Sequence, residues 1–184
     1  VEAILFANGI KTEFDQETLA QAQTAPAAVT DVDIEGRLGL RKETIFTIDG
    51  ADARDFDDAV SIQRLGNGNY KLGVHIADVS HYVRAGTPLD KEAFTRGTSV
   101  YLADRVIPML PVALSNGICS LNPHVDRLTM SVFMEVDQNG GVVDFSLHEA
   151  VIRSAERMTY DDVAALLAHA DPALEQKYAY LLPT

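Results

Sequence analysis

The sequence "TIFTIDGADARDFDDAVSIQRLGNGNYKLGVHIADV" (residues 44–79) places an acidic run between two apolar, strand-like runs. Five of the ten residues in 49–58 are aspartates, and Arg54 is the basic residue among them. Carboxylates this close repel one another, and burial costs each of them hydration free energy. The β-branched and aromatic residues on either side predict strands, with the acidic run as the loop that joins them.

The residues that follow the acidic run predict a β-hairpin. Residues 59–65 and 70–79 are strand-like and flank the sequence "GNGN". Asn67-Gly68 between two such runs is typical of a type I′ turn, because both turn positions then need a positive φ. A second hairpin is predicted over 128–152, with its turn at Asn139-Gly140.

Helix signals surround these hairpins. Thr87 and Pro88 favour a helix start, and Gly97 favours its end. The sequence "TYDD" (159–162) predicts another helix start, and Pro172 a third. With no βαβ rhythm, the chain is predicted to be an α+β fold with a mainly antiparallel sheet and surrounding helices.

Residues 1–36 have a different character from the rest. The sequence "FDQETLAQAQ" has Asp15 as an N-cap and then good helix formers, and a linker poor in bulky residues follows it. We therefore predict a helical linker over 1–36 and a separate domain over 37–184.

The composition limits the function classes. The 184 residues carry a net charge of −12, which argues against a surface that binds nucleic acid by itself. No apolar run reaches membrane-spanning length, and the start lacks a basic signal-peptide region. The single cysteine, Cys119, fits a reducing compartment and reads as a small buried hydrophobe rather than a nucleophile. Both ends look like cuts within a longer chain.

The acidic run has two interpretations. It is either a solvated acidic loop or a site for a hard cation, since carboxylate oxygens are the usual ligands of Mg²⁺ and Mn²⁺. Phe56 within the run favours an anchored loop. An EF-hand starting at Asp49 fails, because it would need glycine at Arg54 and glutamate at Val60. Zinc is disfavoured because paired His or Cys ligands are missing.

These residues resemble the signature of the ribonuclease II / ribonuclease R (RNB) family. The resemblance begins with "TIDGADARDFDDAVSI" and continues in order through "LGVHIADVSHYV", "PLDKEAFTRGTSVYLADRVIPMLP" and "LSNGICSLNPHVDRLTMSVFMEVD". It covers about residues 37–168 and looks closer to ribonuclease R. It implies that 37–184 is the N-terminal half of the catalytic domain, part of a β-barrel-like core. The family's catalytic arginine and second base-clamping aromatic would then lie outside this chain.

The resemblance implies roles for five residues. Asp49 and Asp58, with Asp57, would hold Mg²⁺, or Mn²⁺ as the alternative ion. Asp57 and Asp55 would be catalytic. Asp52 also fits the motif but is not one of the four site aspartates, and it is interpreted as structural or peripheral. Tyr101 would stack on a base near the RNA 3′ end; without the resemblance it is interpreted as a strand residue in a half-buried sheet.

The implied function is metal-dependent 3′-to-5′ hydrolysis of RNA that releases nucleoside 5′-monophosphates, in RNA decay and processing. The expected substrate is the 3′ end of single-stranded RNA, in the cytoplasm, with no membrane and no stable protein partner. The alternatives are a non-catalytic RNA- or metal-binding module and an acidic protein-interaction domain.

Two further groups of polar residues were weighed. His75 and His81 flank "IADVS". One interpretation places them near the acidic loop, but a structural role is preferred. Asp126 and Arg127 in "SLNPHVDRL" are read as a structural ion pair, with support of the site as the alternative.

Overall fold

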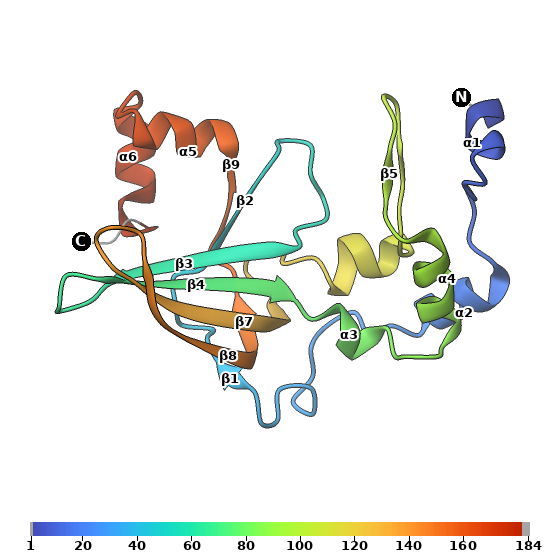
Figure 1. The fold of residues 1–184 in the computed structure, drawn as a ribbon, viewed down its shortest axis with the longest axis horizontal. Helices are drawn as coiled ribbons and strands as arrows, with labels where there is room; N and C mark the ends of the chain where they lie inside the picture. The colour runs from blue at the N-terminus through green and yellow to red at the C-terminus, as the bar shows by residue number, and fades with distance from the viewer. Residues whose placement is uncertain (1, 182–184) are drawn as a thin grey trace. The chain divides into compact units, whose positions relative to one another are not determined.

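The computed structural model describes residues 2–181, which form two compact units. The sheet unit contains residues 28–78 and 119–181, and the helical unit contains residues 2–27 and 79–118. All four aspartates of the predicted site belong to the sheet unit, whereas Tyr101 belongs to the helical unit. Figure 1 shows the course of the chain through both.

The sheet unit is built on one mixed sheet with the strand order β1-β8-β7-β4-β3-β2-β9. The strands are β1 (Leu38–Gly39), β2 (Phe46–Asp49), β3 (Asp58–Arg64), β4 (Tyr70–Ala77), β7 (Asp126–Val136), β8 (Val142–Arg153) and β9 (Glu156–Thr159). Each edge strand, β1 and β9, pairs in parallel with its neighbour, and the other pairs are antiparallel. The predicted α+β class with a mainly antiparallel sheet is therefore confirmed. The described strands form an open sheet, not a closed barrel.

The β3–β4 hairpin has the predicted strands but a different turn. The register is regular from Asp58↔Ile76 to Arg64↔Tyr70. Gly68 has a φ of +89°, whereas Asn67 lies outside the positive-φ region. A type I′ turn needs a positive φ at both central residues, so the predicted turn type is wrong. The hydrogen bond from Gly68 N to the oxygen of Leu65 (3.0 Å) fits a type I turn followed by a left-handed glycine.

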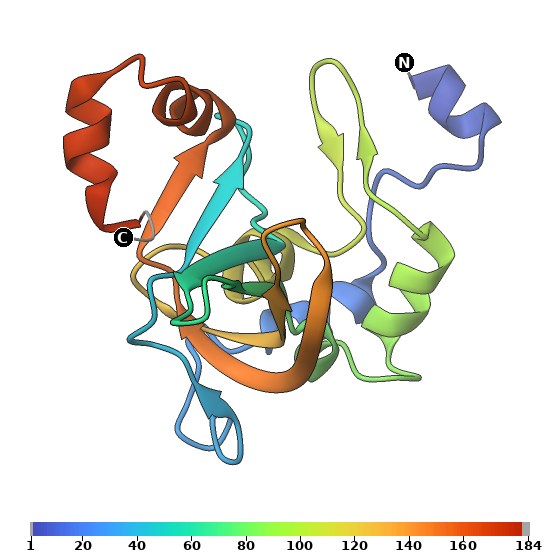
Figure 2. The same cartoon turned by 60° about the vertical axis from the view of Figure 1, so that its left-hand side comes forward.

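The β7–β8 hairpin is the longest element and turns where it was predicted. Gly140 has a φ of +83°, and its N–H donates to the oxygen of Asp137 at 3.0 Å. The pairing is shifted between Glu135 and Val136, next to this turn. Figure 2 shows that this hairpin is strongly bent, which gives the whole sheet a curved form.

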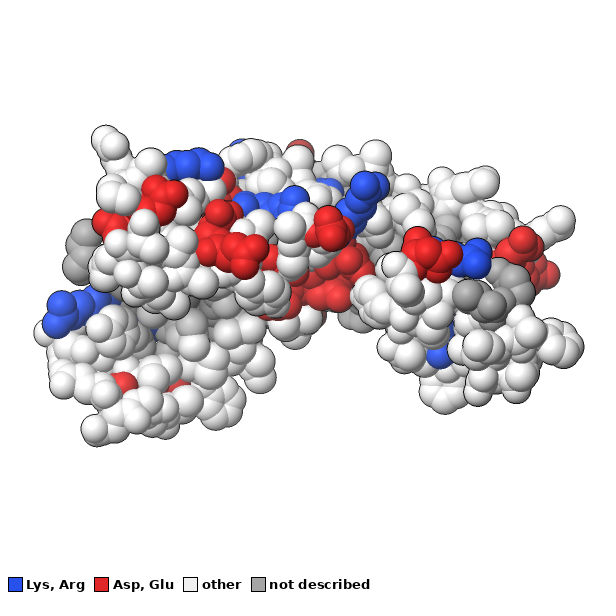
Figure 3. Space-filling model, turned by 90° about the horizontal axis from the view of Figure 1, so that it is seen from above, with Lys and Arg blue, Asp and Glu red and all other residues white. Residues whose placement is uncertain are grey.

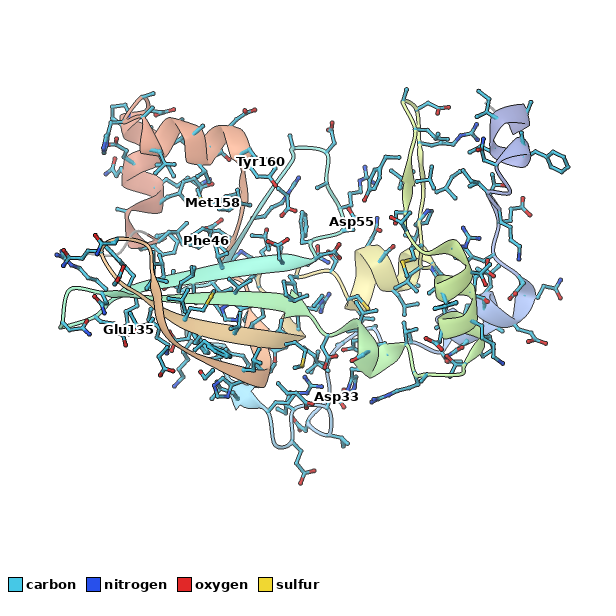
Figure 4. The ribbon with its side chains drawn as sticks, in the orientation of Figure 1. Asp33, Phe46, Asp55, Glu135, Met158 and Tyr160 are labelled. Carbon is cyan, nitrogen blue, oxygen red and sulfur yellow. The ribbon has the colours of Figure 1, made fainter. Side chains whose placement is uncertain are left out.

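Two helices cover the β2–β9 edge of the sheet. They are α5 (Tyr160–Leu167) and α6 (Pro172–Tyr178), with a 3₁₀ turn, η2 (Ala179–Leu181), after them. Thr159 and Asp162 form a capping box at the start of α5, as the sequence "TYDD" predicts. Met158 is buried in a cluster with residues of both helices, and Phe46 of β2 packs against that cluster (Figure 4). This packing fixes the strand that leads into the acidic run.

The helical unit contains short helices and a small two-stranded ribbon. Its elements are α1 (Glu2–Ala7), α2 (Gln16–Gln23), α3 (Val79–Tyr82), α4 (Pro88–Arg96), β5 (Val100–Tyr101), β6 (Val106–Ile107) and the π-helical η1 (Ala113–Ile118). Asp15 and Thr87 cap α2 and α4 as predicted, and Gly97 ends α4 with a φ of +71°. Among the described residues, no helix has the length and hydrophobicity that a membrane crossing requires. The division into 1–36 and 37–184 remains a prediction.

Candidate active site on the acidic loop

The acidic loop, defined as residues 50–57, joins β2 to β3 where these two strands diverge. Asp49 is the last residue of β2 and Asp58 is the first residue of β3. Figure 4 shows Asp55 on the limb of the loop that returns to β3. In the view from above, a dense acidic patch lies where Figure 1 places this loop (Figure 3). An aspartate therefore flanks the loop on each side, and the loop itself carries Asp52, Asp55 and Asp57.

The electrostatics of the loop show that its aspartates act on one another. The pKa of Asp57 is raised, first because the surrounding chain limits the hydration of its carboxylate and then because three other aspartates repel it. Those three are Asp55, Asp58 and Asp49. The pKa of Asp49 is also raised, chiefly by burial, with repulsion from Asp58 and Asp55 added. The structure therefore brings the four predicted aspartates within electrostatic range of one another.

Asp49 also has an unusual local environment. Its Oδ2 atom is buried and accepts no hydrogen bond from the residues that the structure describes. A buried polar atom without a partner costs free energy, and a metal ion is one way to supply the partner. Thr47 and Arg157 lower the pKa of Asp49, which offsets only part of the burial effect.

The donor set fits a hard divalent cation held by few protein ligands. Within residues 2–181, no three His, Cys, Asp or Glu side chains stand in an arrangement that could hold a metal ion. Mg²⁺ usually takes one or two carboxylates and fills its other positions with water and substrate phosphate. The carboxylates of this loop, which repel one another, suit an ion that takes one or two of them. They do not form a site in which every metal ligand comes from the protein.

Ser120 holds the middle of the loop from a distant part of the chain. Its buried hydroxyl donates to the oxygen of Arg54 (3.1 Å) and accepts from the N–H of Phe56 (3.0 Å). Phe56 is 4% exposed, and its oxygen accepts from Leu121 N at 2.8 Å. Asp55 lies between the two residues that Ser120 binds. The interpretation of Phe56 as an anchor is consistent with these contacts.

Arg157 of β9 holds the first limb of the loop. Its Nη2 atom lies 2.6 Å from the oxygen of Ala51 and 3.2 Å from the oxygens of Gly50 and Ala53. The guanidinium carbon is also 5.1 Å from the centre of the Phe56 ring, within cation–π range. The loop backbone is thus bound by a cation from another strand.

Sequence reasoning missed both Ser120 and Arg157. Their contacts join residues 64 to 107 positions apart, so no local pattern predicts them. The available signals were weak: a serine inside the apolar sequence "ICSL" and an arginine in a short strand before a helix cap. A sequence pattern gives the type of a residue but not its distant contacts.

Tyr101, the predicted RNA-binding residue, lies in β5 and pairs with Val106 of β6. Its side chain is 68% exposed, while that of the neighbouring Val100 is half-buried, as in a strand with one face open to solvent. Exposed aromatic rings are the groups on which nucleic-acid bases stack in proteins. Its role in RNA binding remains a prediction.

His75 and Cys119, two further residues considered in the sequence analysis, are buried and have structural roles. His75 is fully buried, its Nε2 lies 3.1 Å from Ser61 Oγ, and burial lowers its pKa to about 4. Burial raises the pKa of Cys119 to about 12, so its thiol is not a nucleophile at neutral pH. His81 lies in α3 of the helical unit.

Asp126 forms its ion pairs with arginines distant in sequence. Arg153 lies 2.8 Å from it and Arg41 lies 3.4 Å from it. Arg127 donates from Nε to the oxygen of Ser120 (2.7 Å) and from Nη1 to the main-chain oxygen of Asp126 (2.9 Å). Arg127 therefore supports the residue that holds the acidic loop, which is the supporting role first given as the alternative.

Comparisons with known proteins were made for the whole chain. The RNB-domain family model matches residues 37–182. Ribonuclease R 1 of Lactococcus lactis is 55% identical over 172 residues, which are 94% of this chain and 21% of that protein. Ribonuclease R of Thermotoga maritima is 57% identical over 166 residues, which are 90% of this chain and 23% of that protein. The chain therefore spans about a fifth of the length of these curated relatives.

Solved structures agree with the sequence relatives. RNase R of Mycoplasma genitalium in complex with double-stranded RNA superposes with a TM-score of 0.87 at 31% identity, over 92% of this chain and 30% of that one. Yeast Ssd1, described as a pseudonuclease, has a TM-score of 0.77 at 22% identity, over 95% of this chain and 23% of that one. The likeness to Ssd1 concerns the fold alone.

Proposed function

The chain belongs to the ribonuclease II / ribonuclease R (RNB) family of 3′-to-5′ exoribonucleases, and we propose that it carries the acidic part of such an active site. The proposed reaction is metal-dependent hydrolysis of RNA phosphodiesters from the 3′ end, which releases nucleoside 5′-monophosphates in RNA decay and processing. One observation carries this proposal: four aspartates repel one another on a loop whose backbone is held by other side chains.

The proposed roles follow the positions of the carboxylates. Asp49, Asp57 and Asp58 are the proposed carboxylates for Mg²⁺ or Mn²⁺, of which one or two would hold an ion while water and substrate phosphate fill its other positions. Asp57 and Asp55 would contact the reacting phosphate and the attacking water. When bound, a divalent cation offsets the charge that develops on the phosphate and favours attack by water. The carboxylates orient these groups, and the anchored loop keeps them in place.

The proposed substrate is the 3′ end of single-stranded RNA. The match to an RNA-bound RNase R supports RNA as the ligand class. Tyr101, whose side chain is 68% exposed, would stack on a base. Base–aromatic stacking tolerates any sequence, which suits an enzyme that degrades RNA of any sequence. The cytoplasm is the proposed location, without membrane attachment or a stable protein partner.

A second candidate function is a non-catalytic RNA- or metal-binding module. It is kept because no three acidic, histidine or cysteine side chains of residues 2–181 form a complete metal site by themselves. The aspartates distinguish the two functions. A binding module does not need all four carboxylates, whereas hydrolysis does.

The test is RNA hydrolysis by a hybrid enzyme: L. lactis ribonuclease R 1 with its matching segment replaced by this chain. Asp57→Asn is compared with Asp52→Asn, which removes the same charge from an exposed position in the same loop. We expect Asp57→Asn to lower the hydrolysis rate about 10²- to 10⁴-fold, the usual range for a group that acts in proton transfer. Asp52→Asn should keep the rate of the unmodified hybrid.

RNA affinity is measured on the same proteins. Asp57→Asn should retain it, whereas Tyr101→Ala should lose about 1 to 3 kcal/mol of binding, the contribution of one stacked base. Tyr101→Phe should restore the loss. Equal hydrolysis by the Asp57→Asn and unmodified hybrids would exclude the proposed site and leave the binding module.

A further inference from the structure

Both limbs of the acidic loop are held by side chains from other parts of the sheet unit. Arg157 comes from β9, and Ser120 comes from the segment between η1 and β7. Both residues bind main-chain atoms of the loop. The loop can therefore keep its course without using its own carboxylates for that purpose.

We propose that Arg157 and Ser120 are positioning residues that fix the four aspartates before a metal ion or RNA binds. The proposal rests on the proposed function, because it assigns support to that same site. Neither residue is a catalytic residue in this scheme. They act through the backbone of residues 50–56.

Arg157 is suited to the first limb of the loop. One of its nitrogens, Nη2, lies within hydrogen-bond range of three oxygens, those of Gly50, Ala51 and Ala53. The guanidinium carbon lies 5.1 Å from the centre of the Phe56 ring, and a lysine ammonium has no planar face for this contact. The positive charge also lowers the pKa of Asp49, so Arg157 reduces the cost of gathering the carboxylates.

Ser120 is suited to the second limb. Its hydroxyl acts as both donor and acceptor, to the oxygen of Arg54 and from the N–H of Phe56. These two contacts bracket Asp55 and hold the main chain on either side of it. Arg127 donates to the oxygen of Ser120 at 2.7 Å, so Ser120 is itself held. The two anchors therefore control different carboxylates: Arg157 controls the limb after Asp49, and Ser120 the limb around Asp55.

The first test is hydrogen exchange of the loop amides in this chain, without metal. Arg157→Met should speed exchange at Ala53, whose N–H donates to the oxygen of Gly50 within the limb that Arg157 binds. Arg157→Lys should keep the charge but restore only part of the protection, because the lysine nitrogen ends one bond short of the position of Nη2. Ser120→Ala should speed exchange at Phe56, whose N–H loses its acceptor.

Each variant has a matched control. Arg153→Met removes an arginine that pairs with Asp126 near the end of β8. Ser131→Ala removes a fully buried serine hydroxyl, which lies 2.8 Å from His75 Nδ1. Both controls should leave exchange in residues 50–57 unchanged. If Arg157→Met unfolds the chain, Arg157→Lys and Ser120→Ala still test the proposal.

The second test is calorimetric titration of the same proteins with Mn²⁺. Removal of a group that orients metal ligands typically lowers metal affinity about 10- to 100-fold, and we expect this range for Arg157→Met and Ser120→Ala. Faster exchange together with weaker Mn²⁺ binding supports the proposal. Unchanged exchange in the loop, or faster exchange with unchanged Mn²⁺ affinity, would overturn it.

Failure of the proposed function gives a different pattern. If the unmodified chain binds no Mn²⁺, the metal site is not formed in this chain, and the exchange rates alone decide the positioning role. Variant-specific exchange at Ala53 and Phe56 would then still support it. Uniform exchange in all variants would overturn it.

Discussion

The β7–β8 turn and the acidic loop both join antiparallel strands of the sheet unit, and both carry acidic residues, but their carboxylates have different partners. In the turn, Asp137 Oδ1 accepts from the N–H groups of Asn139 and Gly141, each at 2.8 Å. Beside it, Glu135 accepts from the side-chain amides of Asn67 and Asn69. In the turn region, the carboxylates hold neighbouring residues in place.

The acidic loop reverses this arrangement. Its backbone is bound by Arg157 and Ser120, while Asp49 Oδ2 is buried and accepts no hydrogen bond from a described residue. The comparison teaches that a cluster of acids becomes a candidate site when other groups hold the backbone. The number of acids alone does not distinguish the two regions.

The largest expected effect is on metal binding. The double variant Asp57→Asn/Asp58→Asn should abolish binding of Mg²⁺ and Mn²⁺ to this chain in a calorimetric titration, because it removes two oxygens of the proposed site. The double variant Glu135→Gln/Asp137→Asn removes the same charge from the turn region and should leave binding intact. Equal losses of metal binding in both double variants would mean that the ion is attracted by the net charge of the chain and is not bound specifically by the acidic loop.

The sequence predicted the local elements well and the distant contacts poorly. The two hairpins and the capped starts of α4 and α5 follow from residues that lie within a few positions of one another. The edge strands β1 and β9 were missed, since each is short and pairs in parallel with a strand far away in sequence. The type of the Asn67-Gly68 turn was wrong because the dipeptide alone does not fix φ at Asn67.

The acidic residues of the candidate site were predictable from the sequence, but the residues that hold the loop in place were not. The acidic run is continuous in sequence, so the four aspartates are easily found, and the resemblance to a known family assigned their roles. Arg157 and Ser120 are close to the loop only because β9 pairs with β2 and residue 121 binds Phe56. Such positions follow from tertiary structure, which a single sequence does not reveal.

The next largest effect is on stability and concerns the aromatic anchor. Phe56→Ala should lower the free energy of unfolding by about 3 to 5 kcal/mol, since a buried phenylalanine leaves a cavity. Phe145→Ala, on β8 near the turn, should change it by about 0.5 kcal/mol or less, because that ring is 64% exposed. Urea denaturation of this chain measures both. Similar values would contradict the anchoring of the loop.

The smallest expected effect is on stability: Asp49→Asn and Asp137→Asn should change the free energy of unfolding in opposite directions. The folded pKa of Asp49 is raised, so the folded chain releases its proton less readily than the unfolded chain, and stability is lost as the pH rises above 3.8, the ordinary aspartate value. At pH 7 without metal, Asp49→Asn should therefore raise the free energy of unfolding by about 0.5 kcal/mol, allowing for solvent screening. The gain should vanish below pH 3.8.

Asp137→Asn should act in the opposite direction. It weakens two charge-assisted hydrogen bonds from backbone N–H groups, so the free energy of unfolding at pH 7 should fall by about 0.5 kcal/mol. Thermal or urea denaturation of both variants, with and without Mg²⁺, measures the pair. Added Mg²⁺ should stabilise the Asp137→Asn chain as it does the unmodified one and should stabilise Asp49→Asn less. The same sign for both substitutions would show that the carboxylates of the loop and of the turn have the same structural role, and the distinction between a ligand site and a structural turn would then be lost.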